Sequence, residues 1–153
     1  IAALIANRGW YYTPHLVKSI GKKGPLPVYK KKNYTMVKAE HFDPIIEGMR
    51  RAVNENGGTA RRARLLDMVV CGKTGTAQNP QGEDHSVFIC FAPMVNPKIA
   101  ISVYVENAGA GGSWAAPIAS LMIEQYLNHK TADPEKEKRI LEANLMNVKK
   151  SGK

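Results

Sequence analysis

Hydrophobic positions in the middle of the chain follow the pattern of three consecutive strands. Apolar residues, many of them Val and Ile, recur through 65–77, 85–93 and 98–106, and the last segment alternates them with Ala, Ser and Tyr. Turn-forming residues fill the short gaps between these segments. Because connections of this length join neighbouring strands, we expect an antiparallel sheet meander.

Helical spacing of apolar residues flanks the predicted strands on both sides. Residues 43–54 form a helix in this interpretation, with Asp43 as its cap and Pro44 at its first position. Its apolar stripe consists of Ile45, Ile46, Met49, Ala52 and Val53. A second helix is expected over 113–128, and its predicted inner face consists of Ile118, Leu121, Met122 and Tyr126. Helices on either side of a meander predict an α+β fold.

The two ends of the chain differ from this central part. Residues 1–7 have the character of the last turns of a helix that stops at Gly9, so we expect the chain to be a piece of a longer protein. After residue 130 the sequence becomes highly charged, which predicts a tail with a short exposed helix. We therefore divide the chain into a domain portion, 1–130, and a charged tail, 131–153.

The composition allows one domain with a core and gives it a basic surface. The 153 residues are 44% hydrophobic, and 22 Lys and Arg against 13 Asp and Glu give a net charge of +9. Several lysines lie in or beside two stretches expected to be extended, 10–20 and 28–37. The charge leaves open a module that binds nucleic acid or another anionic polymer. However, no nucleic-acid-binding motif and no interleaved aromatic residues accompany these lysines.

The two cysteines, Cys71 and Cys90, are too few for a disulfide framework and lack the spacing of a zinc site. We expect them to be small, half-buried strand residues. A hairpin centred between Pro80 and Gln81 would place them opposite each other, so a cross-strand disulfide is the alternative. The histidines also lack metal-ligand spacing, and no metal site is predicted.

The segment Gly72-Lys-Thr-Gly-Thr-Ala77 indicates chemistry. Its Gly-Lys-Thr also ends the phosphate-binding loop, but that loop needs a glycine where Asp67 stands and a helix after the threonine. Here strand-forming residues precede the segment, and Asn79-Pro80 follows it. The second interpretation is a strand segment that resembles the Lys-Thr-Gly element of penicillin-binding proteins and serine β-lactamases. For the triplet alone, a solvated strand lysine is the alternative.

The residues around this element resemble penicillin-binding proteins along most of the chain. Cys71 to Gln78 is similar to the family's Ala-Gly-Lys-Thr-Gly-Thr-Ala-Gln, and further similar segments follow the family's order. These segments are 5–9, 14–17, 57–60, 84–93, 96–100, 105–109 and 115–119. The resemblance covers about residues 1–130 and is closest to the monofunctional, class B proteins. Within them, 106–118 is more similar to the cell-elongation type, penicillin-binding protein 2, than to the division type. The resemblance implies a fold: the C-terminal portion of the transpeptidase fold that this family shares with serine β-lactamases.

By this resemblance, substrate is bound by Lys73, Thr74, Gly75 and Thr76. The hydroxyls of Thr74 and Thr76 would hold the terminal carboxylate, and the backbone N–H of Thr76 would donate to the oxyanion. Lys73 would supply positive potential that tunes the proton network of the nucleophile. Because side chains alternate along a strand, Lys73 and Gly75 should face one side and the two threonines the other. His85 is expected to have a structural role or, alternatively, to line the cleft.

The family's catalytic serine is not found in this sequence. It belongs to a Ser-x-x-Lys motif at a helix start, and a Ser-x-Asn motif completes the acid–base network. Ser19 to Lys22 matches the first motif by letters, but Gly21 and Gly24-Pro25 exclude a helix start there. No Ser-x-Asn is present. We therefore expect the nucleophile to lie upstream, and this chain alone to be inactive.

The resemblance also implies the setting of the whole protein. It would be a peptidoglycan D,D-transpeptidase that cross-links stem peptides through an acyl-serine intermediate, without a cofactor. It would work on the extracytoplasmic face of the bacterial inner membrane, held by an anchor upstream. Its partners would be stem peptides, β-lactam antibiotics and elongation machinery such as a SEDS-family glycosyltransferase, with no nucleic acid. A non-catalytic homologue that acts as a scaffold is a further alternative.

Overall fold

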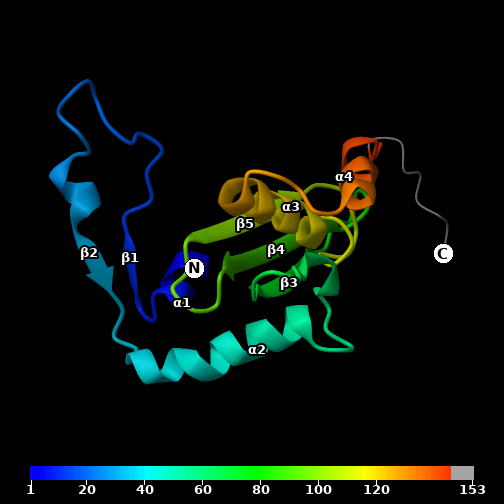
Figure 1. Cartoon of the computed structure of the whole chain (residues 1–153), viewed down its shortest axis with the longest axis horizontal. Helices are drawn as coiled ribbons and strands as arrows, with labels where there is room; N and C mark the ends of the chain where they lie inside the picture. Colours follow the sequence, from blue (N-terminus) through cyan, green and yellow to red (C-terminus); the bar gives the residue numbers. More distant parts are fainter. Residues whose placement is uncertain (146–153) are drawn as a thin grey trace.

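A computed structural model describes residues 1–145, and a three-stranded antiparallel sheet forms its centre (Figure 1). The strands are β3 (Cys71–Ala77), β4 (His85–Ala92) and β5 (Ile99–Val105), in the order β3-β4-β5. Helix α2 (Asp43–Asn54) runs along β3, and α3 (Ala115–Asn128) lies across the sheet on the side of β4 and β5. The predicted α+β fold, a meander with flanking helices, is confirmed. The first predicted strand is shorter than expected, because 65–70 forms no strand.

The two faces of the sheet carry different parts of the core. Phe88 and Cys90 point toward α3, whereas Cys71 and Phe91 pack with α2 and the short helix α1 (Ala2–Ala6) on the other face. All four side chains are fully buried. The sheet is therefore covered on both faces, and α2 packs against β3 (Figure 1).

The register between β3 and β4 rules out the predicted alternative of a disulfide. Cys71 lies opposite Phe91 and Gly72 lies opposite Cys90, so the hairpin is centred on Gln81. A shift of one position moves a side chain to the other face of a sheet, and the two cysteines consequently point away from each other. Both are free thiols. Burial raises the pKa of Cys71 to about 11 and that of Cys90 to about 12.

Helix α2 begins differently from the prediction. Asp43 is the first helical residue and Phe42 occupies the cap position, without a side-chain cap. The Asp43 carboxylate instead accepts a hydrogen bond from Arg8 Nε at 2.9 Å. Within the predicted stripe, the fully buried residues are Ile46, Met49 and Val53. Ile45 is exposed, because it lies one residue off that line.

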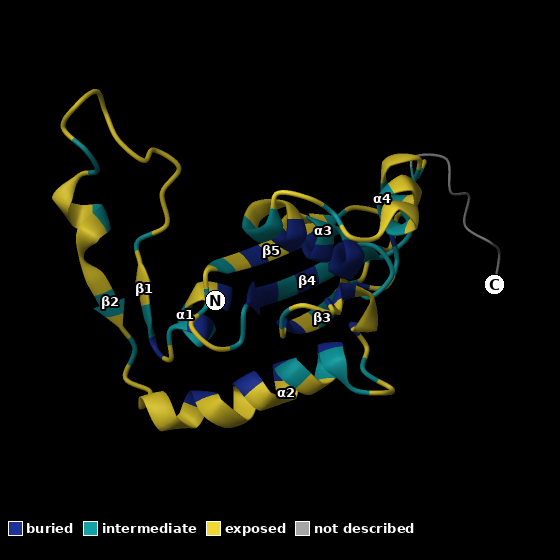
Figure 2. Cartoon of the chain, viewed as in Figure 1, coloured by how far each residue is buried: buried dark blue, intermediate teal, exposed yellow. Residues whose placement is uncertain are grey.

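The predicted inner face of α3 is wrong at two of its four residues, Met122 and Tyr126, whereas Ile118 packs against the core. Met122 and Tyr126 are 49% and 60% exposed, whereas the neighbouring Ile123 is fully buried. The buried residues are mostly small: Ala115, Ala116, Pro117, Ala119, Ser120, Ile123 and Glu124. Small side chains let the helix approach the sheet closely, whereas Met122 and Tyr126 are left exposed. Figure 2 shows buried and exposed positions along α3.

The segment between α1 and α2 forms a two-stranded ribbon that extends away from the main sheet (Figure 1). Its strands are β1 (Trp10–Tyr12) and β2 (Lys32–Tyr34), with 3₁₀ turns η1 (Pro27–Lys30) and η2 (Ala39–Phe42). The strands are shorter than the predicted extended stretches. Lys32 places its amine 4.0 Å from the centre of the Trp10 ring, a cation–π contact.

The charged tail contains the short exposed helix that was predicted, α4 (Pro134–Leu141). Asp133 caps it by accepting a hydrogen bond from the backbone N–H of Lys136 at 2.9 Å. The rest of the predicted tail, 146–153, lies outside the described residues. Within 1–145, none of the helices has the length and apolar character needed to cross a bilayer.

Candidate active site

The Lys-Thr-Gly element lies on β3, which is an edge strand of the sheet among the described residues. A hollow of about 550 Å³ opens beside this strand. We call it the β3 groove. It is lined by Gly58, Thr59, Arg61, Arg62, Thr74, Thr76, Ala110, Gly111, Gly112 and Ser113. An edge strand leaves backbone groups available to an extended ligand, so this groove suits a peptide.

The two threonines of the element line the groove, and Lys73 and Gly75 do not. This division follows the alternation expected along a strand. The Lys73 amine is exposed and donates to the backbone carbonyl of Thr74 at 2.7 Å. The strand therefore offers two hydroxyls to a ligand on one side and a cation on the other.

Thr59 lines one wall of the β3 groove and contacts β3. Its hydroxyl lies 3.0 Å from the hydroxyl of Thr74, within hydrogen-bond distance. Thr59 belongs to the turn between α2 and the 3₁₀ turn η3 (Arg61–Ala63). The sequence placed 57–60 among the family-like segments but assigned no site role to Thr59, and only the fold brings it to the strand.

The opposite wall, 110–113, is fixed against the sheet by its backbone. The buried Ser86 hydroxyl donates to the carbonyl of Ala110 at 3.0 Å and accepts from the N–H of Ala115 at 3.1 Å. A Cβ at Gly111 would lie 2.2 Å from the carbonyl oxygen of Val87. There is no room for a side chain at Gly111, so glycine allows this wall to reach the strands.

Two arginines of η3 border the groove and give it a positive potential. Arg61 is held by the side-chain oxygen of Asn56, and Arg62 donates to the carbonyl of Ser113 at 3.4 Å. Neither forms an ion pair with a carboxylate of the described residues. Guanidinium groups of this kind attract a carboxylate ligand.

His85 lies at the start of β4 and is not among the residues that line the groove. Its Nδ1 accepts a hydrogen bond from the backbone N–H of Asn107 at 3.1 Å, and its ring centre lies 5.3 Å from that of Tyr104. These contacts hold the loop after β5. A cleft-lining role for His85 stays a prediction.

Ser19, which matches the nucleophile motif by letters, lacks the surroundings of a catalytic serine. Ser19 is exposed and lies in a segment without helix, and Lys22 lies in a turn. In the family's motif the lysine follows one helical turn after the serine, so both side chains share a face. Ser19 and Lys22 lack that geometry.

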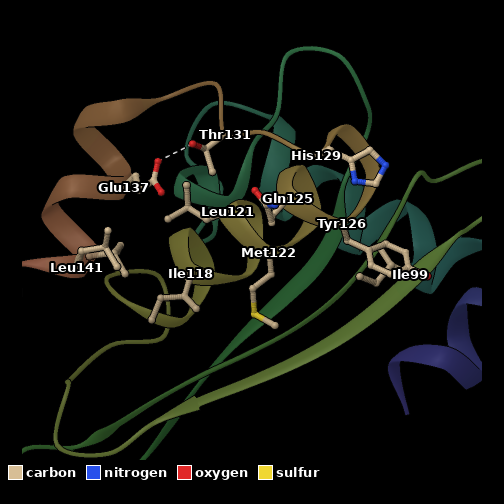
Figure 3. A pocket seen from close by; sticks show the side chains of 11 residues that line it. Ile99, Ile118, Leu121, Met122, Gln125, Tyr126, His129, Thr131, Glu137 and Leu141 are labelled. Carbon is tan, nitrogen blue, oxygen red and sulfur yellow. Dashed lines mark hydrogen bonds between the residues drawn. The ribbon is translucent and has the colours of Figure 1, made fainter. Parts of the chain in front are cut away.

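A larger hollow of about 760 Å³ lies outside the β3 groove, between α3 and α4 (Figure 3). Its lining is mostly apolar and includes Leu121, Met122 and Tyr126, which were predicted to face inward. Thr131 donates to the Glu137 carboxylate at 2.6 Å at its rim. It shares no lining residue with the β3 groove.

Metal-ligating side chains do not gather anywhere in 1–145, since no group of three His, Cys, Asp or Glu residues is placed to hold an ion.

Comparison with known proteins identifies the family and the part of it that this chain covers. Residues 1–124 match the family described as penicillin binding protein transpeptidase domain. The peptidoglycan D,D-transpeptidase MrdA of Haemophilus influenzae is 36% identical over 155 aligned residues, which cover 87% of this chain and 23% of that protein. The chain thus spans about a quarter of this curated relative.

Solved structures agree with the sequence match. The crystal structure of Pseudomonas aeruginosa penicillin-binding protein 2 in complex with WCK 5153 has a TM-score of 0.71 and 35% identity, covering 82% of this chain and 28% of that one. Penicillin-binding protein A from Mycobacterium tuberculosis, in an imipenem acyl-enzyme complex, has a TM-score of 0.66 and 32% identity, covering 82% and 29%. Both are transpeptidase-type folds of the predicted kind.

Proposed function

The chain belongs to the penicillin-binding protein transpeptidase family, and we propose that it forms the β3 side of the substrate groove in a peptidoglycan D,D-transpeptidase. The observation that carries the proposal is the pair of hydroxyls, Thr74 and Thr76, on an edge strand that faces a groove bordered by Arg61 and Arg62. This family membership replaces the alternative of a basic nucleic-acid-binding module.

The groove is suited to the carboxyl end of a stem peptide. The hydroxyls of Thr74 and Thr76 donate to the terminal carboxylate, and the guanidinium groups of Arg61 and Arg62 supply the opposite charge. The edge of β3 accepts the peptide backbone as an added strand. A β-lactam carries a comparable carboxylate beside its reactive carbonyl, so it occupies the same place.

The chemistry of the whole protein then follows the acyl-enzyme route. An upstream serine attacks the carbonyl of the penultimate D-Ala, the terminal D-Ala leaves, and the amine of a neighbouring peptide releases the acyl group. The Thr76 backbone N–H donates to the oxyanion, a contact worth about 3–4 kcal/mol where such donors have been removed. Lys73 supplies positive potential near the nucleophile. This chain provides the groove and not the nucleophile, so it has no transpeptidase activity by itself.

The biological setting is proposed from the same membership. The similarity to MrdA and to penicillin-binding protein 2 supports a role in cell elongation, with elongation machinery such as a SEDS-family glycosyltransferase as partner. The domain would lie on the extracytoplasmic side of the inner membrane, with an anchor upstream.

The test is labelling with a fluorescent penicillin. The whole protein that carries this segment should form a covalent adduct at an upstream serine, and the 153-residue chain should form none. Thr76→Val should slow adduct formation about tenfold to a hundredfold, as expected when a hydrogen bond to a charged group is lost. Ser102→Ala, at an exposed hydroxyl on β5, is the matched control. A label on Ser19, or equal rates for the two variants, would contradict the proposal.

A further inference from the structure

Helix α4 lies outside the part of the chain that matches the transpeptidase family, yet it contacts the wall of the β3 groove. The match ends at residue 124, and α4 spans Pro134–Leu141. Its Arg139 reaches the turn before α3, where Ser113 lines the groove. A segment beyond the matched residues is therefore connected to the proposed substrate site.

Two contacts fix Arg139 in place. Its guanidinium carbon lies 4.4 Å from the centre of the Trp114 ring, and its Nη2 donates to the carbonyl of Ser113 at 3.1 Å. One turn earlier on the helix, the Lys136 amine donates to the Ser120 hydroxyl at 3.3 Å. A planar guanidinium can stack on an indole and donate in its own plane at the same time, which a lysine amine cannot do.

The carbonyl of Ser113 is shared between two arginines from different parts of the chain. Arg139 Nη2 approaches it at 3.1 Å from α4, and Arg62 Nη1 approaches it at 3.4 Å from η3. Arg62 itself lines the groove. The two guanidinium groups therefore connect the wall at Ser113 to both η3 and α4.

A displacement of Ser113 would change the shape of the groove, because the neighbouring Gly112 is closely packed against the opposite wall. A Cβ at Gly112 would lie 2.3 Å from the carbonyl oxygen of Thr59, and Thr59 in turn contacts Thr74. A movement of the wall is consequently transmitted to the threonine expected to bind the carboxylate.

We propose that Arg139 is a positioning residue for the β3 groove: stacked on Trp114, it holds the Ser113 carbonyl, and α4 thereby sets the width of the site that receives a substrate's terminal carboxylate. The inference rests on the proposed function, because it assigns a role within that same site. Arg139 does not line the groove and acts through Ser113. Its loss should therefore weaken ligand binding and leave the chemical step unchanged.

The kinetic test uses the whole protein that carries this segment and follows acylation by a fluorescent penicillin. In Arg139→Ala, the penicillin concentration that gives half the maximal rate should rise about threefold to tenfold, as expected for one lost hydrogen bond to a carbonyl. The rate at saturation should stay within about twofold of the wild-type rate. Arg139→Lys should recover part of the effect, since an amine can still donate to Ser113. Lys138→Ala, at an exposed position on the same helix, is the control.

A second measurement on the same variants is hydrogen exchange of the backbone amides in 110–116. It should speed up in Arg139→Ala and stay unchanged in Lys138→Ala. The proposal is overturned if the two variants behave alike in both measurements, or if Arg139→Ala lowers binding and saturating rate equally, as general destabilisation would. If the wild-type protein takes no label, the proposed function fails, and the exchange measurement still decides whether Arg139 holds this wall.

Discussion

The hydroxyl oxygens of Thr59 and Thr74 lie 3.0 Å apart, so the turn after α2 is joined directly to the edge strand β3. Thr74 lies in the Lys-Thr-Gly element, whereas Thr59 comes from a different part of the chain. The contact orients the Thr74 side chain before any ligand arrives. The orientation of a hydroxyl that we propose binds substrate therefore depends on a residue outside the motif.

Replacing Thr59 by Val should lower the efficiency of acylation by penicillin in the whole protein. The Thr74 hydroxyl would lose its partner, and a neutral hydrogen bond is worth about 1 kcal/mol, or roughly a fivefold effect. Thr59→Ser keeps the hydroxyl and should stay close to wild type. If Thr59→Val acylates as fast as Thr59→Ser, Thr59 does not orient Thr74.

Gly111→Ala should destabilise the fold. The new Cβ would lie 2.2 Å from the carbonyl oxygen of Val87 and 2.4 Å from that of Gly75, and neither backbone group can move without breaking the sheet. We expect a loss of about 1–3 kcal/mol in the free energy of unfolding, measured with urea.

Gly48→Ala is the matched control for that substitution. Gly48 lies within α2, and a Cβ there meets nothing within 4 Å. Alanine is favoured over glycine inside a helix by about 0.5–1 kcal/mol, so this variant should be more stable than wild type. An equal loss of stability in both variants would contradict the crowding at Gly111.

The observed orientation of α3 can be tested at two adjacent residues. Ile123 is fully buried and Met122 is 49% exposed. Ile123→Ala should cost about 2–5 kcal/mol in the free energy of unfolding, because it leaves a cavity in the core. Met122→Ala should cost well under that amount. The reverse order in a urea titration would restore the face predicted from the sequence.

The two thiols should be unreactive in the folded protein. Burial raises the pKa of Cys71 to about 11 and that of Cys90 to about 12, from an ordinary value of 9.0. Both should resist a disulfide reagent at pH 8 and react fully in guanidinium chloride. One reactive thiol under native conditions would contradict the burial of that side chain.

The same shifts predict how stability changes with pH. The folded state keeps both thiols protonated, whereas the unfolded state loses protons near pH 9.0. The unfolded state therefore binds fewer protons as the pH rises, and the free energy of unfolding should fall from about pH 9 toward pH 11–12. Urea titrations of the wild type and of Cys71→Ala together with Cys90→Ala would show whether the decline depends on these residues.

The sequence predicted the elements better than it predicted their faces. The strand segments and α2 were recognisable because their apolar residues follow a regular period. Met122 and Tyr126 were wrongly assigned to the inner face of α3 because these large residues dominate its pattern, while its contact with the sheet depends on alanines. Burial of a helix depends on fit as well as on hydrophobicity.

The sequence likewise predicted only part of the site. The Lys-Thr-Gly element was identified from its residue types and spacing, and the face of its threonines followed from strand alternation. The roles that we propose for Thr59 and Arg139 could not be predicted, because both depend on contacts between segments distant in sequence. The cysteine register was missed by one position, since the exact centre of a hairpin depends on its turn and not on the strands.

The crowded backbone at Gly111 and Gly112 has an evolutionary consequence. A population exposed to an antibiotic that occupies the β3 groove can escape only through substitutions that the fold tolerates. The two glycines leave no room for side chains, so resistance should not arise there. Selection should act instead on the groove's exposed arginines, Arg61 and Arg62, where a changed side chain can alter drug affinity while the protein still folds.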